Sequence, residues 1–415
     1  MKIAHVGPPR ARTGGPAGYL WELAQVAVLD ERFTVSFPDE APPQRPTPPP
    51  SWIQRGRASL GKLKRCVFGA PTFRRHALED LREPGGAAAE LLAAAETLSH
   101  AEVAPSLEAA LVNADVLFAH DAWTADRLLA RRRPGQDVWL FLHAPFPLGF
   151  FQVWSFGRPD LPWQTIAELT DVRAATEREL ATFRAVDRLI LPCAEAGDEF
   201  LRFDSRFAEP LARAEFLPTG AAGPNRRFPA EDRVRLRRRF GLPEAAPIAL
   251  FLGNDQPYRG LDTLLDALPA LAPGPGLVAV AGPAPDRLPT HPRLRALGRV
   301  TAVADLLAAV DFVINVNRFS LFDLSTIEAL AAGSPLLLHA TGGNRAFGRL
   351  GAGCRMFPDL APETIARALD GLFRLDEFER QRLADASRAC WVEHLSPAVW
   401  WRRHAELYRQ EVVPG

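Results

Sequence analysis

The stretch NRFSLFDLSTIEALAAGSPLLLHATGG, residues 317–343, joins a helical pattern directly to a buried strand pattern. Small and apolar residues fill 325–333, as in a helix that is packed on nearly all sides. The apolar run at 335–340 follows at once and has the length of a buried strand. Helices that alternate with such strands are typical of a parallel sheet covered on both faces, so the stretch predicts an α/β fold.

The same alternation fills most of the chain, in two series. In the first, apolar runs and the helical patterns between them predict four strands and two helices: 2–6, 115–120, 137–144 and 186–193, with 17–29 and 165–183. The second series predicts four strands and two helices in the same way: 247–254, 276–283, 311–317 and 335–340, with 260–271 and 325–333. Each series is typical of one doubly wound parallel sheet.

The chain length agrees with two domains. At 415 residues the chain is long for one core and suits two units of about 150 to 200 residues each. The boundary is expected within 215–228, where Pro, Gly and Asn cluster. Ligands of such sheets bind beyond the carboxyl ends of the strands, so the site is expected in a cleft between the two domains.

Composition excludes several classes of function. The 49 basic and 49 acidic residues balance, so no global charge favours nucleic acid as a partner. The only lysines are Lys2, Lys62 and Lys64, which leaves no Schiff-base lysine deep in the fold for a pyridoxal enzyme. The cysteines lack metal-binding or disulfide-framework spacing: Cys66, Cys193, Cys354 and Cys390. No signal peptide or 18-residue apolar run is present, so we expect a cytoplasmic protein.

One segment interrupts the alternation and is interpreted as an insertion over 41–105. It opens with a proline-rich connector, and residues 52–75 then mix aromatic and aliphatic side chains with arginine and lysine. Such a piece could rest on anionic lipid at the inner face of the cell membrane or meet an extended acceptor. A solvated lid over the sheet is the alternative.

Glycines and histidines mark the carboxyl ends of the first strands. Gly14 and Gly15 open the first helix and could let backbone amides approach an anion, although the dinucleotide spacing G-x-G-x-x-G is absent. His120 and His143 each end a predicted strand, where they could meet substrate or be structural histidines. The loop APFPLGF after His143, which contains Phe146, is expected to line the cleft.

Arg259 and Glu328 are the charged candidates in the second series. Arg259 lies at a helix entrance, where the helix dipole repels a cation unless an anion such as a diphosphate is present. Glu328 shares one helical stripe with Leu324 and Ile327, in a helix that is otherwise uncharged. A buried carboxylate needs a partner; the two hydroxyls of a ribose would serve, and a distant arginine is the alternative.

These motifs together resemble the retaining nucleotide-sugar glycosyltransferases of family 4, which have the GT-B fold. The most specific segment is IEALAAGSPLL, 327–337, which is similar to the family pattern E-A-M-A-x-G-x-P-V-V. The resemblance implies two Rossmann-like parallel-sheet domains that face a central cleft. It places the acceptor-side domain at 1–218, completed by a crossing helix at 396–415, and the nucleotide-sugar domain at 219–395.

The resemblance implies a hexosyltransferase that moves a sugar from a nucleotide-sugar, UDP-sugar before GDP-sugar, to a glycan, lipid-linked or natural-product hydroxyl. It also implies that no metal and no other cofactor is needed. The implied catalytic residues are His143, Arg259, Ser320 and Asp323. The implied donor-binding residues are Gly15, Gly253, Asn254, Arg259, Val300, Phe322, Leu324 and Glu328. The implied acceptor-side residues are Gly14, His120 and Phe146.

Two positions depart from the family pattern. Ser320 occupies the place of a second glutamate, eight residues before Glu328, that normally contacts the donor sugar. Asn254 occupies the place of an arginine that normally contacts the diphosphate. We expect Asp323 and nearby arginines to compensate and the site to accept an unusual sugar.

Other functions stay open on sequence grounds. A GT-B sugar-nucleotide epimerase would turn over the donor without an acceptor, and a degenerate binder would hold the nucleotide-sugar without transfer. An NAD-dependent oxidoreductase lacks the dinucleotide fingerprint and is the weakest alternative.

Overall fold

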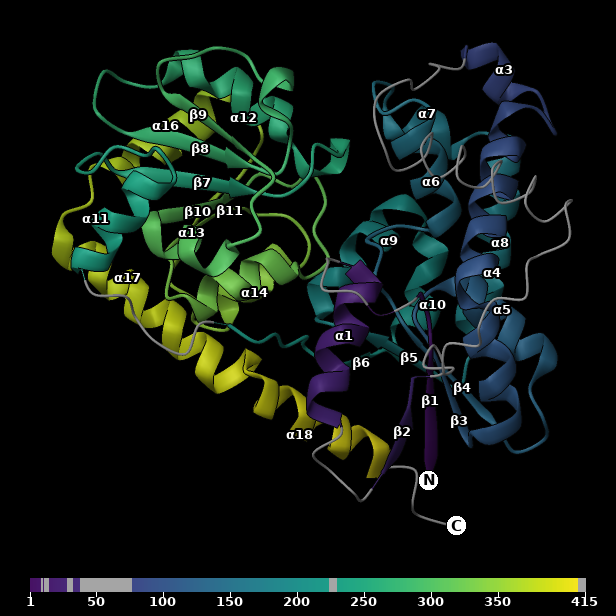
Figure 1. The fold of residues 1–415 in the computed structure, drawn as a ribbon. Helices are drawn as coiled ribbons and strands as arrows, with labels where there is room; N and C mark the ends of the chain where they lie inside the picture. Colours follow the sequence, from purple (N-terminus) through teal and green to yellow (C-terminus); the bar gives the residue numbers. More distant parts are fainter. Residues whose placement is uncertain (9, 11–14, 28–32, 38–76, 224–229, 410–415) are drawn as a thin grey trace, which may run out of the picture. The chain divides into compact units, whose positions relative to one another are not determined.

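The computed structural model describes the chain except residues 9, 11–14, 28–32, 38–76, 224–229 and 410–415. The described residues form two compact units, residues 1–190 with 200–215 and residues 191–199 with 216–415. Each unit contains one six-stranded sheet with helices packed around it (Figure 1). The two predicted doubly wound sheets are thereby confirmed.

The sheet of the first unit has the strand order β2-β1-β3-β4-β5-β6. Its strands are β1 (Lys2–Val6), β2 (Thr34–Ser36), β3 (Val116–Ala119), β4 (Asp137–Phe141), β5 (Arg188–Leu191) and β6 (Glu215–Phe216). Strand β1 pairs in parallel with both β2 and β3, so the direction of winding reverses at β1. The switch point, where this architecture leaves room for ligands, lies between the carboxyl ends of β1 and β3.

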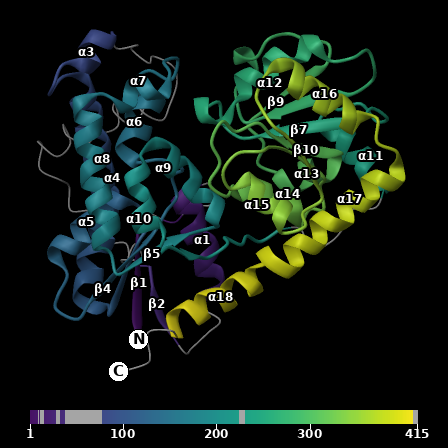
Figure 2. The ribbon, with the colours of Figure 1, turned by 180° about the vertical axis from the view of Figure 1, so that it is seen from behind.

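Helices pack around this first sheet (Figure 2). They are α1 (Gly15–Ala27), α3 (Leu78–Arg82), α4 (Ala87–Asn113), α5 (Ala122–Arg131), α6 (Leu148–Phe156), α7 (Trp163–Ala167), α8 (Thr170–Ala185), α9 (Asp198–Phe203) and α10 (Ala208–Leu211). Helix α4 contacts β1, so the described end of the predicted insertion belongs to the helical layer. The basic amphipathic piece at 52–75 lies outside the described residues.

The predicted continuous helix over 165–183 is wrong. Helix α7 ends at Ala167 and α8 begins at Thr170, because Leu169 adopts an extended conformation, with φ −61° and ψ 137°. Leu169 is buried, so its side chain packs into the interior at the point where the helix is interrupted.

The sheet of the second unit has the order β12-β11-β10-β7-β8-β9. Its strands are β7 (Ile248–Leu252), β8 (Leu277–Ala281), β9 (Leu294–Gly298), β10 (Phe312–Asn315), β11 (Leu336–His339) and β12 (Cys354–Phe357). Strand β7 pairs in parallel with β8 on one side and with β10 on the other. The winding therefore reverses between β7 and β10, and the second switch point lies at their carboxyl ends.

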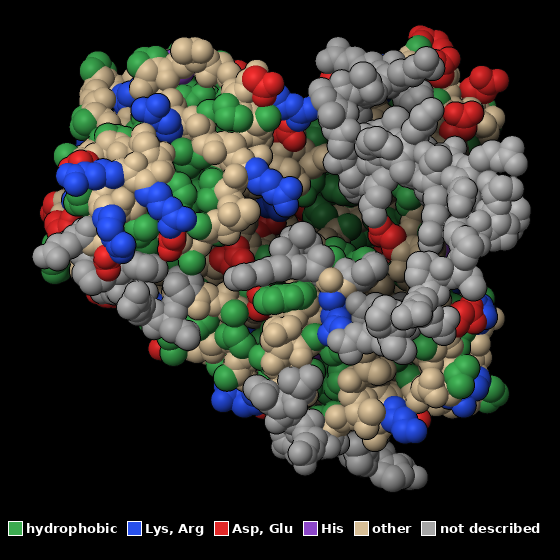
Figure 3. Space-filling model, viewed as in Figure 1, with side chains coloured by type: hydrophobic (Ala, Val, Ile, Leu, Met, Phe, Trp, Pro, Cys, Tyr) green, Lys and Arg blue, Asp and Glu red, His purple; other side chains and the backbone are tan. Residues whose placement is uncertain are grey.

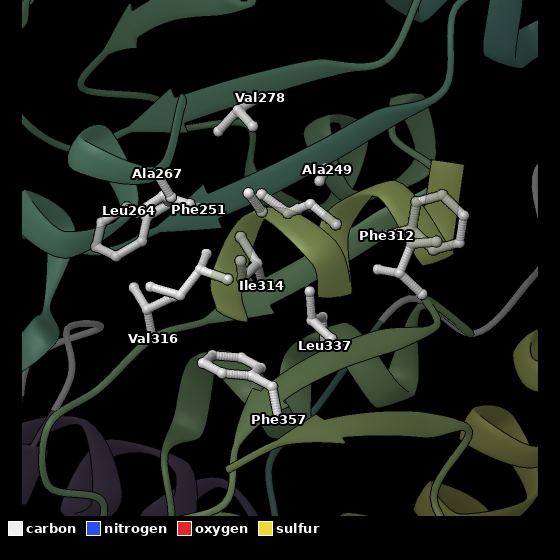
Figure 4. Packing of buried hydrophobic residues seen from close by; sticks show 14 of the residues in the cluster. Ala249, Phe251, Leu264, Ala267, Val278, Phe312, Ile314, Val316, Leu337 and Phe357 are labelled. Carbon is white, nitrogen blue, oxygen red and sulfur yellow. The ribbon is translucent and has the colours of Figure 1, made fainter. Parts of the chain in front are cut away.

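The α-helices of this unit are α11 (Ala230–Arg239), α12 (Leu261–Ala267), α13 (Val303–Ala309), α14 (Leu324–Ala331), α15 (Asn344–Arg349), α16 (Pro362–Phe373), α17 (Glu377–Cys390) and α18 (Pro397–Arg409). Side chains of neighbouring strands and of α12 pack into one apolar cluster, which includes Phe251, Leu264 and Ile314 (Figure 4). This core holds the strand ends of the switch point in place. Whether α18 completes the first domain, and where the domains divide, stay predictions.

On the surface drawn in Figure 3, basic and acidic side chains are interspersed with apolar and neutral ones. Among the described helices none is long and apolar enough to cross a membrane.

Candidate functional site

Polar side chains gather at both switch points, one group in each unit. The charged group of the second unit comprises Arg259, Asn315, Asn317, Ser320 and Asp323. The histidine chain of the first unit comprises His5, His120 and His143.

The second switch point holds a small pocket with a polar lining. Residues from the ends of β7 and β10, from the loops that follow them and from the first turn of α14 line it: Leu252, Arg259, Asn315, Asn317, Ser325 and Thr326, together with apolar residues of the strands. Arg259 ends a short 3-10 turn, Pro257–Arg259, directly before α12. Gly260 between them has φ +67°, and a Cβ there would lie 2.1 Å from the Val316 carbonyl oxygen, so only glycine lets the turn approach β10.

Asp323 is the centre of the charged group. Its Oδ2 accepts hydrogen bonds from Asn315 Nδ2 at 3.1 Å and Asn317 Nδ2 at 2.6 Å, and Ser320 Oγ lies 3.0 Å away. Its Oδ1 accepts one from Arg259 at 3.0 Å. Asp323 is the N-cap residue of α14, yet its side chain does not cap the helix. The amides and the guanidinium therefore hold the carboxylate away from the helix end.

Arg259 is largely enclosed in this group. Its side chain is 19% exposed and that of Asp323 is 14% exposed. Burial alone would lower the pKa of Arg259, but the Asp323 carboxylate and Tyr258 raise it above its ordinary value. The ion pair between Arg259 and Asp323 is therefore a strong one, because little water screens it.

Ser320, where the family pattern has an acid, is fully enclosed. Its hydroxyl also lies 2.9 Å from Asn344 Oδ1, and one hydroxyl proton serves only one acceptor at a time. The backbone amide of Gly343 donates to the Ser320 carbonyl at 2.8 Å. A Cβ at Gly343 would lie 1.5 Å from the Leu321 carbonyl oxygen, so the TGG turn must contain glycine to support this loop.

Helix α14 is packed nearly all round, as predicted. Ile327, Ala329, Leu330 and Ala331 are buried, whereas Glu328 is half-buried. Glu328 lies one helical turn from Ser325, which lines the pocket, so the two side chains share a face of the helix.

The other predicted donor-side residues of this unit do not line the pocket. Leu324 begins α14, and Phe322 stacks on Phe347 with ring centroids 4.3 Å apart. Gly253 follows β7, Asn254 is exposed, and Val300 lies in the loop after β9. The structure thus brings together Arg259, Ser320 and Asp323, while Asn254 and Val300 are not among the residues that line the pocket.

The histidine chain spans the first switch point. His5 Nδ1 lies 3.0 Å from His120 Nε2, and His120 Nδ1 lies 2.9 Å from His143 Nε2. His5 is on β1, His120 directly follows β3, and His143 follows β4. Neighbouring parallel strands place such residues on one face of the sheet.

Aromatic rings enclose this chain. Phe118 stacks on His5 and His120, and Tyr19 of α1 contacts the rings of His120 and His143 with centroids 5.2 and 4.9 Å apart. Gly7 leaves space here, because a Cβ at that position would lie 2.8 Å from Leu20 and 3.4 Å from the His120 Cβ. Burial lowers the pKa of His143 to about 3, so its imidazole is neutral at physiological pH.

The loop after His143 is anchored by a buried acid. Glu179 of α8 accepts a hydrogen bond from the Leu148 backbone amide at 2.7 Å, at the start of α6. Burial raises the pKa of Glu179 to about 8, and the Asp121 carboxylate adds to this shift. The carboxyl group is therefore mostly neutral at pH 7.

The predicted residues of the first unit differ in accessibility. Phe146 and His120, predicted on the acceptor side, are fully buried, so neither touches a ligand in this conformation. Gly15, predicted on the donor side, is exposed and begins α1 with φ +69°. Gly14 lies outside the described residues.

Several members of these groups are not marked by local sequence patterns. His5 lies within an apolar strand pattern, although a histidine in such a strand needs a polar partner. Asn315 and Asn317 alternate along a strand end, which places both amides on one side. Among the described residues no group of three or more His, Cys, Asp or Glu could hold a metal ion.

Part of the second unit is similar to a known family of proteins. Residues 246–374 match the family described as Glycosyl transferases group 1, and this range contains the whole charged group. A D-inositol 3-phosphate glycosyltransferase from Streptomyces griseus is 30% identical over 245 residues, which cover 51% of this chain and 52% of that protein. The chain thus spans about half the length of the curated relatives it matches.

Solved structures support the fold along the whole chain. Sucrose-phosphate synthase from Thermosynechococcus elongatus matches with a TM-score of 0.64 and 16% identity, over 99% of this chain and 98% of that one. HepE from Anabaena, solved in complex with UDP-glucose, matches with a TM-score of 0.59 and 16% identity, over 99% and 100%. The predicted GT-B fold is confirmed. Residues 246–374 therefore match the family described as Glycosyl transferases group 1, within a chain that has the GT-B fold.

Proposed function

We propose that the chain is a glycosyltransferase that moves a sugar from a nucleotide-sugar donor to an acceptor hydroxyl with retention and without a metal ion. The observation that carries the proposal is the polar pocket at the second switch point, within the glycosyl transferases group 1 region. Its arginine, amides and hydroxyls suit a ligand that is both anionic and rich in hydroxyl groups.

Arg259 would bind the diphosphate of the donor. It lies next to the first turn of α14, whose N-terminus is not capped by Asp323, and a helix N-terminus favours negative charge. As the sugar leaves, charge develops on the diphosphate, and donors that are already in place stabilise it without reorganisation.

Asp323 would have to release Arg259 when the donor binds. In the structure the carboxylate holds the guanidinium that the diphosphate needs, so donor binding would exchange one anion for another. Once released, Asp323 could accept a hydroxyl of the donor sugar and replace the acid that is absent at Ser320. This exchange would also favour a donor sugar with an unusual hydroxyl pattern.

Glu328 would hold the ribose hydroxyls. It shares a helix face with pocket-lining Ser325, and a half-buried carboxylate is well satisfied by two hydroxyl donors. UDP-sugars are the favoured donors, because HepE, which has the same fold, was solved with UDP-glucose.

The acceptor hydroxyl would be handled in the first unit by His143. The members of the histidine chain are imidazoles and not carboxylates. We therefore favour same-face substitution, in which the leaving diphosphate takes the acceptor proton. The acceptor class stays broad: a glycan, a lipid-linked sugar, a natural product or a phosphorylated polyol such as the one in the name of the Streptomyces relative.

A thermal-shift screen with UDP-, GDP-, ADP- and dTDP-sugars tests donor binding, because a ligand of the folded state raises the melting temperature. The donor that stabilises the wild type is then measured with Glu328→Ala, using Glu363→Ala on α16 as a control. We expect about 10-fold weaker binding for Glu328→Ala, as for the loss of a charged hydrogen bond. Equal affinity of Glu328→Ala and wild type would refute the ribose assignment.

A non-catalytic nucleotide-sugar binder is the second candidate. The observation that favours it is the ion pair that already neutralises Arg259, together with the enclosed Ser320. Such a protein would bind a donor in the thermal-shift screen but release no nucleotide from it, with or without acceptors. Release of nucleoside diphosphate in an acceptor-dependent manner would exclude this candidate.

A further inference from the structure

The two links of the histidine chain have the same orientation of ring nitrogens. In each link an Nδ1 atom of one ring faces an Nε2 atom of the next, from His5 to His120 and from His120 to His143. His5 and His120 are 2% and 0% exposed, whereas His143 is half-buried. The chain therefore has an enclosed end at His5 and an accessible end at His143.

This orientation couples the tautomers of the three rings. A neutral imidazole has one N–H and one lone pair, so each ring that donates from Nε2 must accept at Nδ1. If His143 donates from Nε2 to His120 Nδ1, then His120 donates from Nε2 to His5 Nδ1. All three rings thus carry the proton on Nε2, or all three carry it on Nδ1.

The surroundings favour neutral imidazoles in this chain, and the neutral imidazoles favour the Nε2–H tautomer. Phe118, Phe141 and Tyr19 pack against the imidazoles, and burial in such surroundings disfavours a charged ring. The Nε2–H form is the intrinsically preferred tautomer of neutral histidine, and the coupling adds this preference over three rings. Among the described residues His143 Nδ1 has no hydrogen-bond partner, so its lone pair is available to a ligand.

We propose that His120 and His5 are positioning residues that hold His143 in the Nε2–H form, so that its Nδ1 lone pair accepts a hydrogen bond from a substrate hydroxyl. The coupling of the three tautomers follows from the geometry of the chain, and the choice of Nε2–H follows from the intrinsic preference of neutral histidine. The identity of the hydroxyl, on the donor sugar or on the acceptor, rests on the function proposed above.

The tautomers are read directly by long-range ¹H–¹⁵N spectra of the full chain labelled with ¹⁵N-histidine. The chain has nine histidines, and single His→Phe variants assign the three signals. We expect all three rings to show the Nε2–H pattern near pH 7. An Nδ1–H form or a tautomer average at His143 would overturn the proposal.

Two variants at His120 separate positioning from packing. His120→Phe keeps an aromatic ring but removes both nitrogens, so the His143 signals should shift toward a tautomer mixture. In His120→Asn the amide oxygen can stand in for Nδ1 and accept from His143, so the Nε2–H pattern should return. His5→Phe breaks only the inner link and should give a smaller shift, which keeps the test open if a His120 variant does not fold. His404→Phe is the control, because His404 is equally buried but bonds to the Trp400 carbonyl in α18.

Kinetics test the consequence for the reaction. We expect His120→Phe to lower kcat about 10-fold to 100-fold with donor KM nearly unchanged, as for a misplaced catalytic contact, and His120→Asn to recover most of the rate. Unchanged His143 signals and unchanged kcat in His120→Phe would refute the positioning role. If no donor is turned over at all, the spectra still decide the tautomer, so failure of the proposed function and failure of this inference are distinguishable.

Discussion

The two switch points arise from the same kind of strand reversal, but they differ in the charge of the side chains that gather there. The first unit places the enclosed histidine chain there, and the mostly neutral Glu179 accepts a hydrogen bond from Leu148, which follows His143 closely in sequence. The second unit places a charged pair there, Arg259 with Asp323, surrounded by amide donors. The difference fits a division of work in which one unit holds an anion and the other aligns a neutral hydroxyl.

Substitutions in the charged group should cost the most free energy, because breaking an ion pair that little solvent screens leaves an uncompensated charge. Arg259→Ala should weaken donor binding by about 100-fold, equivalent to roughly 3 kcal/mol, since both the diphosphate and Asp323 lose their cation. Calorimetric titration of the donor identified by the screen measures this loss. Arg287→Ala is the control, since Arg287 pairs with Asp255 nearer the surface. An equal effect of the two substitutions would mean that Arg259 is an ordinary surface cation.

The neutral character of the first unit predicts a pH effect at Glu179. The folded state keeps this proton up to about pH 8, whereas in the unfolded chain the pKa is the ordinary 4.5. Between these values the folded state binds more protons, so the free energy of unfolding falls as pH rises. Glu179→Gln cannot ionise, and its stability relative to the wild type should increase by roughly 3.5 kcal/mol between pH 5 and pH 8.

Denaturant unfolding at several pH values measures this difference. Glu177→Gln, on the exposed side of the same helix, is the control for the loss of a surface carboxylate. A flat profile for Glu179→Gln would show that Glu179 ionises normally, and the contrast between the two units would fail.

Asp323→Asn separates the two roles of the carboxylate. Without the negative charge Arg259 is released, so nucleoside diphosphate should bind about tenfold more tightly, a gain of roughly 1.4 kcal/mol. Transfer should nevertheless become slower, because the amide accepts a sugar hydroxyl less strongly than a carboxylate does. Titration and a transfer assay measure the two effects, with Asp255→Asn as the control. Tighter binding with an unchanged transfer rate would mean that Asp323 only competes with the diphosphate for Arg259 and has no role in transfer.

The smallest effect is expected at Ser320. Ser320→Ala removes a hydroxyl from Asp323 and Asn344, and the stability should fall by about 1 kcal/mol, as for one neutral hydrogen bond. Donor binding should change little, since Arg259 and both asparagines keep their contacts. Denaturant midpoints of Ser320→Ala and of Ser325→Ala, a pocket-lining control, provide the comparison. A large loss of donor binding in Ser320→Ala would show that Ser320 itself contacts the donor.

The strands were predictable because each is buried on both faces and therefore appears as an apolar run. All eight predicted strands exist in the structure, from β1 at Lys2–Val6 to β11 at Leu336–His339. The edge strands β2, β6, β9 and β12 were not predicted, since their partly exposed residues give no such run. Arg259 and Glu328 were predictable as site residues because of their charges. Arg259 lies at a helix entrance and Glu328 in an otherwise uncharged helix, and an unpaired charge destabilises the fold at either position.

Two doubly wound sheets and the candidate residues at their strand ends can be predicted from local sequence patterns, because buried strands and packed helices leave periodic apolar patterns. Which polar groups meet depends on the folded chain. The fold joins His5 to His120 across 115 residues and Arg259 to Asp323 across 64. Asp323, which was expected to replace the missing acid, thus pairs with Arg259, which was expected to bind the diphosphate. Hydrogen bonds between distant segments depend on strand order and register, which local sequence patterns do not encode.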